Sequence, residues 1–157
     1  MSRRRQATRR TIAKDGKFQS ILVSRLVNTI MICGKKSTAQ RIVYGAFDSI
    51  SHKNPASNPV EILQRAVDNA KPRIETKARR VGGATYQVPM EVTVDRQLSL
   101  AVRWLVSFAD ARKGTPMMDA LAAEIMDAYQ GQGNAIRKRD DVHKMAQANK
   151  AFAHLAK

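Results

Sequence analysis

The spacing of apolar residues changes along this chain, and that change most constrains its fold. From about residue 17 to 70, and again from about 95 to 149, apolar residues recur at the spacing of one α-helical face. Residues 73–81 and 84–92 instead alternate polar and apolar side chains, as in a strand with one covered face. Gly82-Gly83 separates these two runs and suits a tight turn that needs positive φ. The pattern predicts a helical protein with one inserted β-hairpin.

Capping residues, prolines and glycines predict where the helices begin and end. Asp15 is expected to cap a helix over about 17–32. Asn58 is expected to cap another helix, which ends at Pro72. The run Ser37-Thr38-Ala39-Gln40 matches a capping box that would open another helix. The remaining three predicted helices cover about 95–112, the stretch from Thr115-Pro116 to Gly131, and about 134–149. The expected fold is mainly α: a six-helix bundle with a protruding two-stranded antiparallel β-hairpin arm between helices three and four.

The chain is strongly basic, and its charge is gathered in segments. It carries 28 Lys and Arg against 13 Asp and Glu, a formal net charge of +15. The segments with excess positive charge are 1–17, 35–53, 71–80 and 134–157, whereas 54–70 and 114–133 are net acidic. Such segments together predict a surface for a polyanion, either nucleic acid or an acidic membrane.

No catalytic pattern is recognisable in the sequence. Cys33 is the only cysteine and the three histidines are far apart, which excludes a disulfide framework and a cysteine zinc site. The run Gly34-Lys35-Lys36-Ser37 resembles the end of a phosphate-binding loop, but Thr29 stands where the upstream glycine is required. We therefore expect no enzyme activity, no cofactor, no metal site and no small-molecule substrate.

A membrane location is also not expected. No run approaches the about 20 apolar residues that cross a bilayer, and the basic start of the chain lacks the apolar stretch of a secretory signal. No predicted helix combines a basic face with an exposed aromatic stripe, which disfavours membrane-surface binding. We expect a cytoplasmic protein.

Basic residues from several elements are candidates for contact with nucleic acid. Arg96 and Arg103 lie seven residues apart, on a helix face opposite the apolar stripe, so both can reach phosphates. Lys35 and Lys36 precede a helix whose N-terminal N–H groups also favour phosphate. The full set of expected contacts is Arg3, Arg4, Arg5, Arg9, Arg10, Lys35, Lys36, Arg73, Lys77, Arg79, Arg80, Arg96 and Arg103. Trp104 and Tyr86 are expected to pack against the protein itself.

These features leave two classes of function open. One is RNA binding, and the other is a basic DNA-binding or architectural nucleoid protein, because helix pairs with a basic β-arm also occur there. A footprint spread over many elements favours a folded RNA, whose irregular shape is contacted from several sides.

Several longer motifs resemble one known family. They are Arg3-Arg4-Arg5, GKKSTA at 34–39 with IVY at 42–44, RRVGGATYQVP at 79–89, Arg103-Trp104, and RDDVHKMAQANKAFAH at 139–154. Together these segments resemble bacterial-type ribosomal protein seven of the small subunit, over nearly the whole chain. We therefore expect one ribosomal-RNA-binding domain over 1–157, with a basic extension at 1–15, the arm at 73–92, and a C-terminal helix and tail at 134–157.

The resemblance implies a specific role. Members of this family bind the 3′ major domain of 16S ribosomal RNA and nucleate assembly of the head of the small subunit. The implied position of the arm tip, Val81, Gly82, Gly83 and Ala84, is near the exit-site tRNA and the mRNA path. The implied protein-partner surface is Ala148, Asn149, Lys150, Phe152 and His154, facing ribosomal protein eleven, and protein nine is a further neighbour. In some bacteria, members also repress translation of their own operon.

Overall fold

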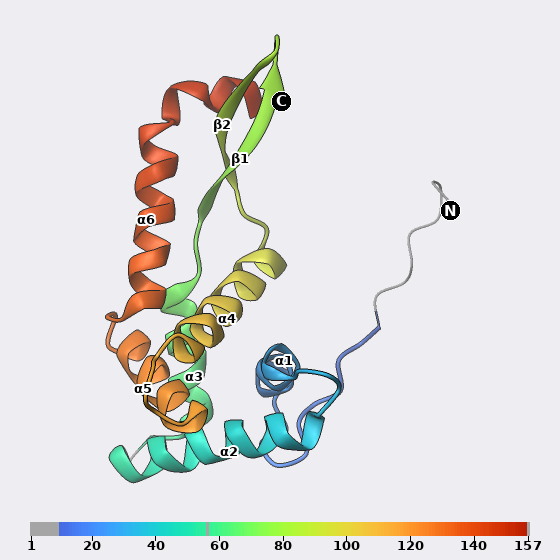
Figure 1. Ribbon diagram of the computed structural model, residues 1–157, viewed down its shortest axis with the longest axis vertical. Coiled ribbons are helices and arrows are strands. Elements are labelled where there is room, and N and C mark those ends of the chain that lie inside the picture. The colour runs from blue at the N-terminus through green and yellow to red at the C-terminus, as the bar shows by residue number, and fades with distance from the viewer. Residues whose placement is uncertain (1–9, 56, 157) are drawn as a thin grey trace.

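The computed structural model describes residues 10–55 and 57–156, and in those residues it shows six α-helices, one 3-10 helix and one two-stranded sheet (Figure 1). The helices are α1 (Ile21–Ile30), α2 (Lys36–Lys53), α3 (Pro59–Ala70), α4 (Val94–Asp110), α5 (Met117–Tyr129), α6 (Asn134–Ala148) and the 3-10 helix η1 (Lys150–Ala156). The strands β1 (Ile74–Val81) and β2 (Ala84–Glu91) lie between α3 and α4. The predicted helical bundle with a hairpin arm is confirmed.

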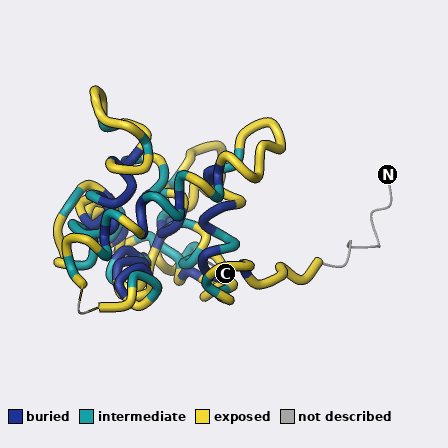
Figure 2. The backbone as a smooth tube through the Cα atoms, turned by 90° about the horizontal axis from the view of Figure 1, so that it is seen from below, coloured by how far each residue is buried: buried dark blue, intermediate teal, exposed yellow. Residues whose placement is uncertain are grey.

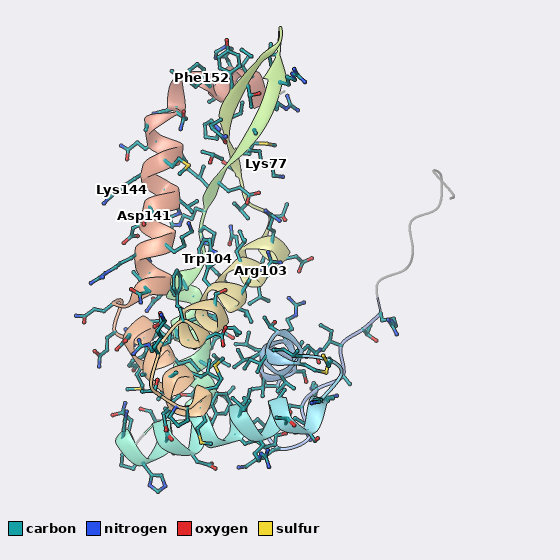
Figure 3. All side chains as sticks on the ribbon, viewed as in Figure 1. Lys77, Arg103, Trp104, Asp141, Lys144 and Phe152 are labelled. Carbon is teal, nitrogen blue, oxygen red and sulfur yellow. The ribbon has the colours of Figure 1, made fainter. Side chains whose placement is uncertain are left out.

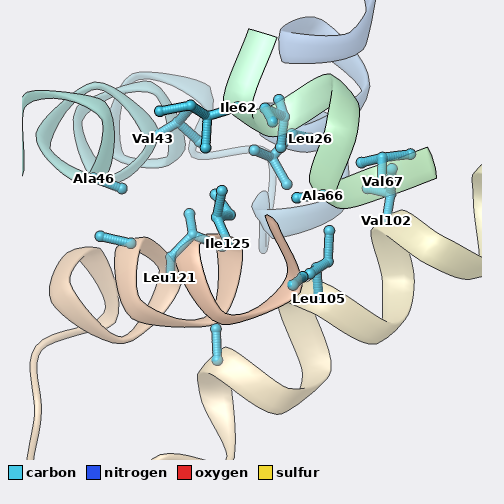
Figure 4. Close-up of a cluster of buried hydrophobic side chains, with 14 of the residues drawn as sticks. Leu26, Val43, Ala46, Ile62, Ala66, Val67, Val102, Leu105, Leu121 and Ile125 are labelled. Atoms are coloured by element: carbon cyan, nitrogen blue, oxygen red, sulfur yellow. The ribbon is translucent and has the colours of Figure 1, made fainter. Parts of the chain in front are cut away.

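The hydrophobic core lies mainly among the first five helices, and Ala135 and Ile136 of α6 also belong to it. α5 packs against α2, α3 and α4, while α1 packs against α2 and α4. Leu26, Val43, Ile62, Leu105 and Leu121, one from each of these helices, point toward one another and are almost entirely buried (Figure 4). Burying each such side chain stabilises the fold by about 1.5–3 kcal/mol. The apolar stripes predicted from helical spacing therefore form one continuous core (Figure 2).

The arm is a regular antiparallel ladder that ends in a glycine turn. Its register pairs Ile74 with Glu91 at the base and Val81 with Ala84 at the tip. Gly82 and Gly83 have φ of 57° and 90°, which confirms the predicted turn with positive φ at both positions. A Cβ at either glycine would meet no atom within 4 Å, so backbone conformation, not space, requires glycine.

The arm does not stand alone. α6 runs beside it and η1 crosses the far part of β2 (Figure 1). Val88 is fully buried beneath this cover, and the ring of Tyr86 packs on Phe152 with centroids 5.2 Å apart. Because an isolated hairpin is marginally stable in water, this intramolecular cover supports the arm. η1 is an element that the sequence did not predict.

Two of the expected helix starts are wrong. α1 begins at Ile21, because Gln19 has a φ of 50° and interrupts the helical path, and Asp15 caps a separate turn instead. α2 begins at Lys36 and its cap, Lys35, makes no side-chain capping bond, so the expected capping box at Ser37 is absent. The third start is confirmed, since Asn58 Oδ1 accepts a hydrogen bond from the Val60 N–H at 3.0 Å.

A buried ionic network sets the direction in which α6 leaves the bundle. Glu124 of α5 is completely buried, and its carboxylate accepts hydrogen bonds from Arg112 Nη2 at 2.6 Å and from the Ala135 N–H at 3.0 Å. Gly133, between α5 and α6, has a φ of 92°, and a Cβ there would lie 2.9 Å from Asp127 Cβ. The network joins the segment that follows α4, the middle of α5 and the first turn of α6.

Within residues 10–55 and 57–156, none of the helices is both long and apolar enough to cross a membrane.

Candidate nucleic-acid interface

A groove of about 700 Å³, called here the α1–α4 groove, lies between residues 10–12, α1 and α4. Three cationic side chains from these three segments line it: Arg10, Arg25 and Arg103. Its other lining residues are Thr11, Ile12, Ile21, Asn28, Thr29, Asp95, Leu98, Ser99 and Val102. The structure therefore brings together two of the predicted contacts, Arg10 and Arg103, that are far apart in sequence. Three guanidinium groups with hydroxyl and amide neighbours form a surface suited to phosphates.

Arg25 is the functional candidate that sequence reasoning missed. It lies among the apolar residues of α1, and its Nε is buried without a hydrogen-bond partner among the described residues. Arg25, Asn28 and Thr29 are spaced three and four residues apart, so they share one face of α1. That polar face was visible in the sequence and was the signal available for finding Arg25.

Arg96, a predicted RNA contact, lies at the junction of the arm and α4. Its Nε donates to both carboxylate oxygens of Glu75, at 2.8 and 2.9 Å, and Glu75 is 9% exposed. This hydrogen bond and the negative charge of Glu75 raise the pKa of Arg96, which stays cationic. Half of the Arg96 side chain remains exposed. Arg96 therefore fastens the base of the arm to α4 and still presents charge to solvent.

The cationic side chains of the arm differ in their surroundings. Lys77 Nζ lies 3.6 Å from a Glu75 oxygen, and Arg79 Nη1 donates to the Leu155 carbonyl at 2.7 Å. Arg80, next to the tip, is exposed. Figure 3 shows Lys77 on the arm and Phe152 at its far end. Of the arm cations predicted to contact RNA, Arg79 thus also holds η1 against the arm.

The other predicted basic residues occupy separate parts of the surface. Lys35 and Lys36 are exposed at the start of α2, after a turn in which Cys33 and Gly34 both have positive φ. Arg73 is exposed at the base of β1. The remaining predicted contacts lie outside the described residues: Arg3, Arg4, Arg5 and Arg9.

The arm tip and the predicted partner surface lie at the same end of the molecule. The tip residues Val81, Gly82, Gly83 and Ala84 are all exposed. In the C-terminal surface, Ala148, Lys150 and His154 are exposed, while Asn149 caps α6 by donating from Nδ2 to the Met145 carbonyl. The ring of Phe152 packs against Tyr86 of the arm, so Phe152 supports this surface from the side of the arm.

Both predicted aromatic packing positions are confirmed. Trp104 is partly buried and packs against the core, and Figure 3 shows it on α4 next to Arg103. Tyr86 packs on Phe152. In residues 10–55 and 57–156, no cluster of three or more His, Cys, Asp or Glu side chains could hold a metal ion.

Comparison with known proteins identifies the family. Residues 2–150 match the family described as ribosomal protein S7p/S5e. The chain is 53% identical over 154 residues to the small ribosomal subunit protein uS7 of Akkermansia muciniphila, covering 98% of both chains. The uS7 proteins of Francisella philomiragia and of Francisella tularensis subsp. holarctica are also 53% identical over the same share. The long match and the hairpin-bearing helical bundle agree with the resemblance in the motifs, and the chain belongs to the ribosomal protein S7p/S5e family.

Proposed function

We propose that this chain binds the 3′ major domain of 16S ribosomal RNA directly and nucleates assembly of the head of the small subunit. Its family is one of structural proteins of the small ribosomal subunit, not of enzymes. The observation that carries the finer proposal is the α1–α4 groove, where Arg10, Arg25 and Arg103 converge from three segments. The whole chain acts as a single ribosomal-RNA-binding domain in this proposal.

The shape of the basic surface supports RNA over duplex DNA as the ligand. The cationic side chains lie on α1, the start of α2, α4, the arm and the N-terminal segment, so no single recognition helix carries them. Contacts spread over several elements suit an RNA junction, whose helices approach from different directions. Most such contacts go to phosphates and fix orientation, while shape provides the selectivity.

The remaining roles are proposed for the end of the molecule that carries the arm tip. The tip contacts exit-site tRNA and the mRNA path, because its exposed glycine turn lets backbone approach a second RNA closely. The surface of α6 and η1 beside it contacts ribosomal protein eleven, and ribosomal protein nine is another neighbour in the head. Repression of the operon messenger would use the same RNA-binding surface. Family membership supports all of these roles.

The test is a filter-binding titration with a 16S junction fragment and a DNA duplex of matched length. We expect tighter binding to the junction, with log affinity falling against log salt by about 0.7–0.9 per neutralised phosphate. The double variant Arg25→Gln/Arg103→Gln should bind the junction about 10-fold or more weakly, and with a shallower salt slope.

Lys113→Gln is the matched control, because Lys113 is exposed beyond the end of α4 and does not line the groove. This control should retain the affinity of the unmodified chain. Equal affinity for the junction and the duplex would contradict the proposal and favour an architectural DNA-binding role.

A further inference from the structure

The turn before α1 is built around one buried carboxylate. Asp15 is 4% exposed, and its Oδ2 accepts hydrogen bonds from the N–H groups of Lys17 at 3.0 Å and Phe18 at 3.1 Å. The hydroxyl of Tyr44, on α2, donates to the same carboxylate, 2.9 Å from Oδ1 and 3.1 Å from Oδ2. This set of contacts, called here the Asp15–Tyr44 clasp, fastens the turn to α2 across 29 residues of sequence.

Further contacts make the turn rigid. The Gln19 N–H donates to the Asp15 carbonyl at 3.0 Å, and the Asp15 N–H donates to the Ser20 carbonyl at 3.3 Å. The ring of Phe18 packs edge-on against Phe47 with centroids 5.0 Å apart. The chain therefore reverses direction between Asp15 and Ser20 and enters α1 from a fixed point.

The clasp stands between the core and the basic N-terminal segment. Residues 10–14 are all exposed, so Asp15 is the first buried residue among those described, and Figure 2 shows the exposed segment leaving the bundle there. Arg10, Thr11 and Ile12 nevertheless line the α1–α4 groove, opposite Arg25 and Arg103. The point at which the segment is fixed therefore places Arg10 at the groove.

We infer that the Asp15–Tyr44 clasp is a positioning device for RNA binding, which holds Arg10 at the α1–α4 groove so that Arg10, Arg25 and Arg103 contact the same RNA. This inference rests on the proposed function. Asp15 and Tyr44 act through Arg10 and do not touch RNA themselves. A segment fixed before binding loses less conformational freedom on binding, and each freely moving long side chain that must be ordered weakens affinity.

The electrostatics of Tyr44 agree with a permanent donor. Burial, and next the hydrogen bond to Asp15, raise the pKa of Tyr44 above its ordinary value of 10.0. The phenol therefore remains protonated and able to donate throughout the neutral range.

The test is a double-mutant cycle in the full chain. Tyr44→Phe removes only the hydroxyl and keeps the ring, and it is combined with the substitution Arg10→Gln. Affinity for the 16S junction fragment is measured by filter binding, and folding is followed by thermal melting. With Arg10 present, Tyr44→Phe should weaken binding about 3- to 10-fold. With Arg10 replaced, the same substitution should change affinity less than about twofold.

A merely structural hydroxyl would behave differently. Equal losses from Tyr44→Phe in both backgrounds, or no loss in either, would overturn the inference, and so would unchanged affinity of the Arg10→Gln variant. Tyr129→Phe on α5, a hydroxyl deletion outside the groove, should leave affinity unchanged in both backgrounds. A different result would contradict the proposed function, namely equal affinity for the junction and the duplex. In that case the double-mutant cycle can still be evaluated with the duplex as the ligand, because the cycle compares the affinities of several variants for one ligand.

Discussion

The backbone N–H of Arg73 donates a hydrogen bond to Nε2 of His143 at 3.0 Å, joining the base of the arm to the middle of α6. A ring nitrogen that accepts must be unprotonated, so this contact requires a neutral imidazole. Burial, and next the positive charge of Arg139, lower the pKa of His143 below its ordinary value of 6.5. The charge of Arg73 acts in the same direction, whereas Asp140 acts against it.

The folded chain should lose stability through His143 as the pH falls below 6.5. The pKa of His143 is lower in the folded state, so the unfolded chain binds more protons as the pH falls below 6.5. The stability that neutral His143 provides above pH 6.5 is therefore lost on acidification. His143→Gln keeps an acceptor oxygen and cannot titrate, so its free energy of unfolding should depend less on pH. Urea unfolding over a pH series measures this, with the exposed His52→Gln as control. A pH profile of His143→Gln identical to that of the unmodified chain would contradict the assignment.

Removing Arg112 should destabilise the fold strongly. Arg112→Met leaves the completely buried Glu124 carboxylate without its cation, which costs about 3–5 kcal/mol in the free energy of unfolding. The double variant Arg112→Met/Glu124→Gln should be more stable than Arg112→Met alone, since the amide oxygen still accepts from Ala135 and no charge is buried. Denaturant unfolding compares the variants. A double variant less stable than the single one would show that the charge pair is not the controlling interaction.

Leu105→Ala should destabilise the bundle by about 2–5 kcal/mol, because Leu105 is fully buried where α4 meets the core. Val94→Ala on the same helix should change stability by less than about 0.5 kcal/mol, because Val94 is 74% exposed. Thermal and urea unfolding of the two variants provide the comparison. Similar losses of stability in the two variants would show that Leu105 is not part of the hydrophobic core.

The cationic side chains of β1 and the glycine turn at the tip of the arm should have separate roles. Replacing Lys77 and Arg80 with Gln should reduce RNA affinity and head assembly, whereas shortening 81–84 should leave assembly nearly intact and disturb exit-site tRNA retention and reading-frame maintenance. Both sets are measured after incorporation into reconstituted subunits. Arg79→Gln should behave differently from Arg80→Gln, because it also releases the hydrogen bond to the Leu155 carbonyl. Collapse of assembly after tip shortening, with normal tRNA retention in the surviving subunits, would make the arm a structural anchor only.

The elements that the sequence predicted well are those decided by local chemistry. The Asn58-Pro59 start of α3, the apolar stripes and the Gly82-Gly83 turn each depend on residues adjacent in sequence or along one helix face. All three appear in the structure as expected.

The elements that were missed depend on distant residues. η1 packs against β2, and its Phe152 packs against Tyr86 in a tilted arrangement, so the conformation of η1 depends on an arm more than sixty residues away in sequence. Asp15 has the residue type of a helix cap, but its hydrogen bond from Tyr44 makes it part of a separate turn. The α1–α4 groove likewise needs three segments to meet, which is why Arg25 was not singled out.

The covering of the arm by η1 has a consequence for the order of events during synthesis. A ribosome makes a chain from its N-terminus, so β1 and β2 emerge well before residues 150–156. Until those residues follow, the nascent hairpin lacks the ring of Phe152 over Tyr86 and the carbonyl that holds Arg79. A bare two-stranded ribbon is only marginally stable in water. The five-helix core can therefore form co-translationally, whereas the arm reaches its lasting form only after η1 has been translated.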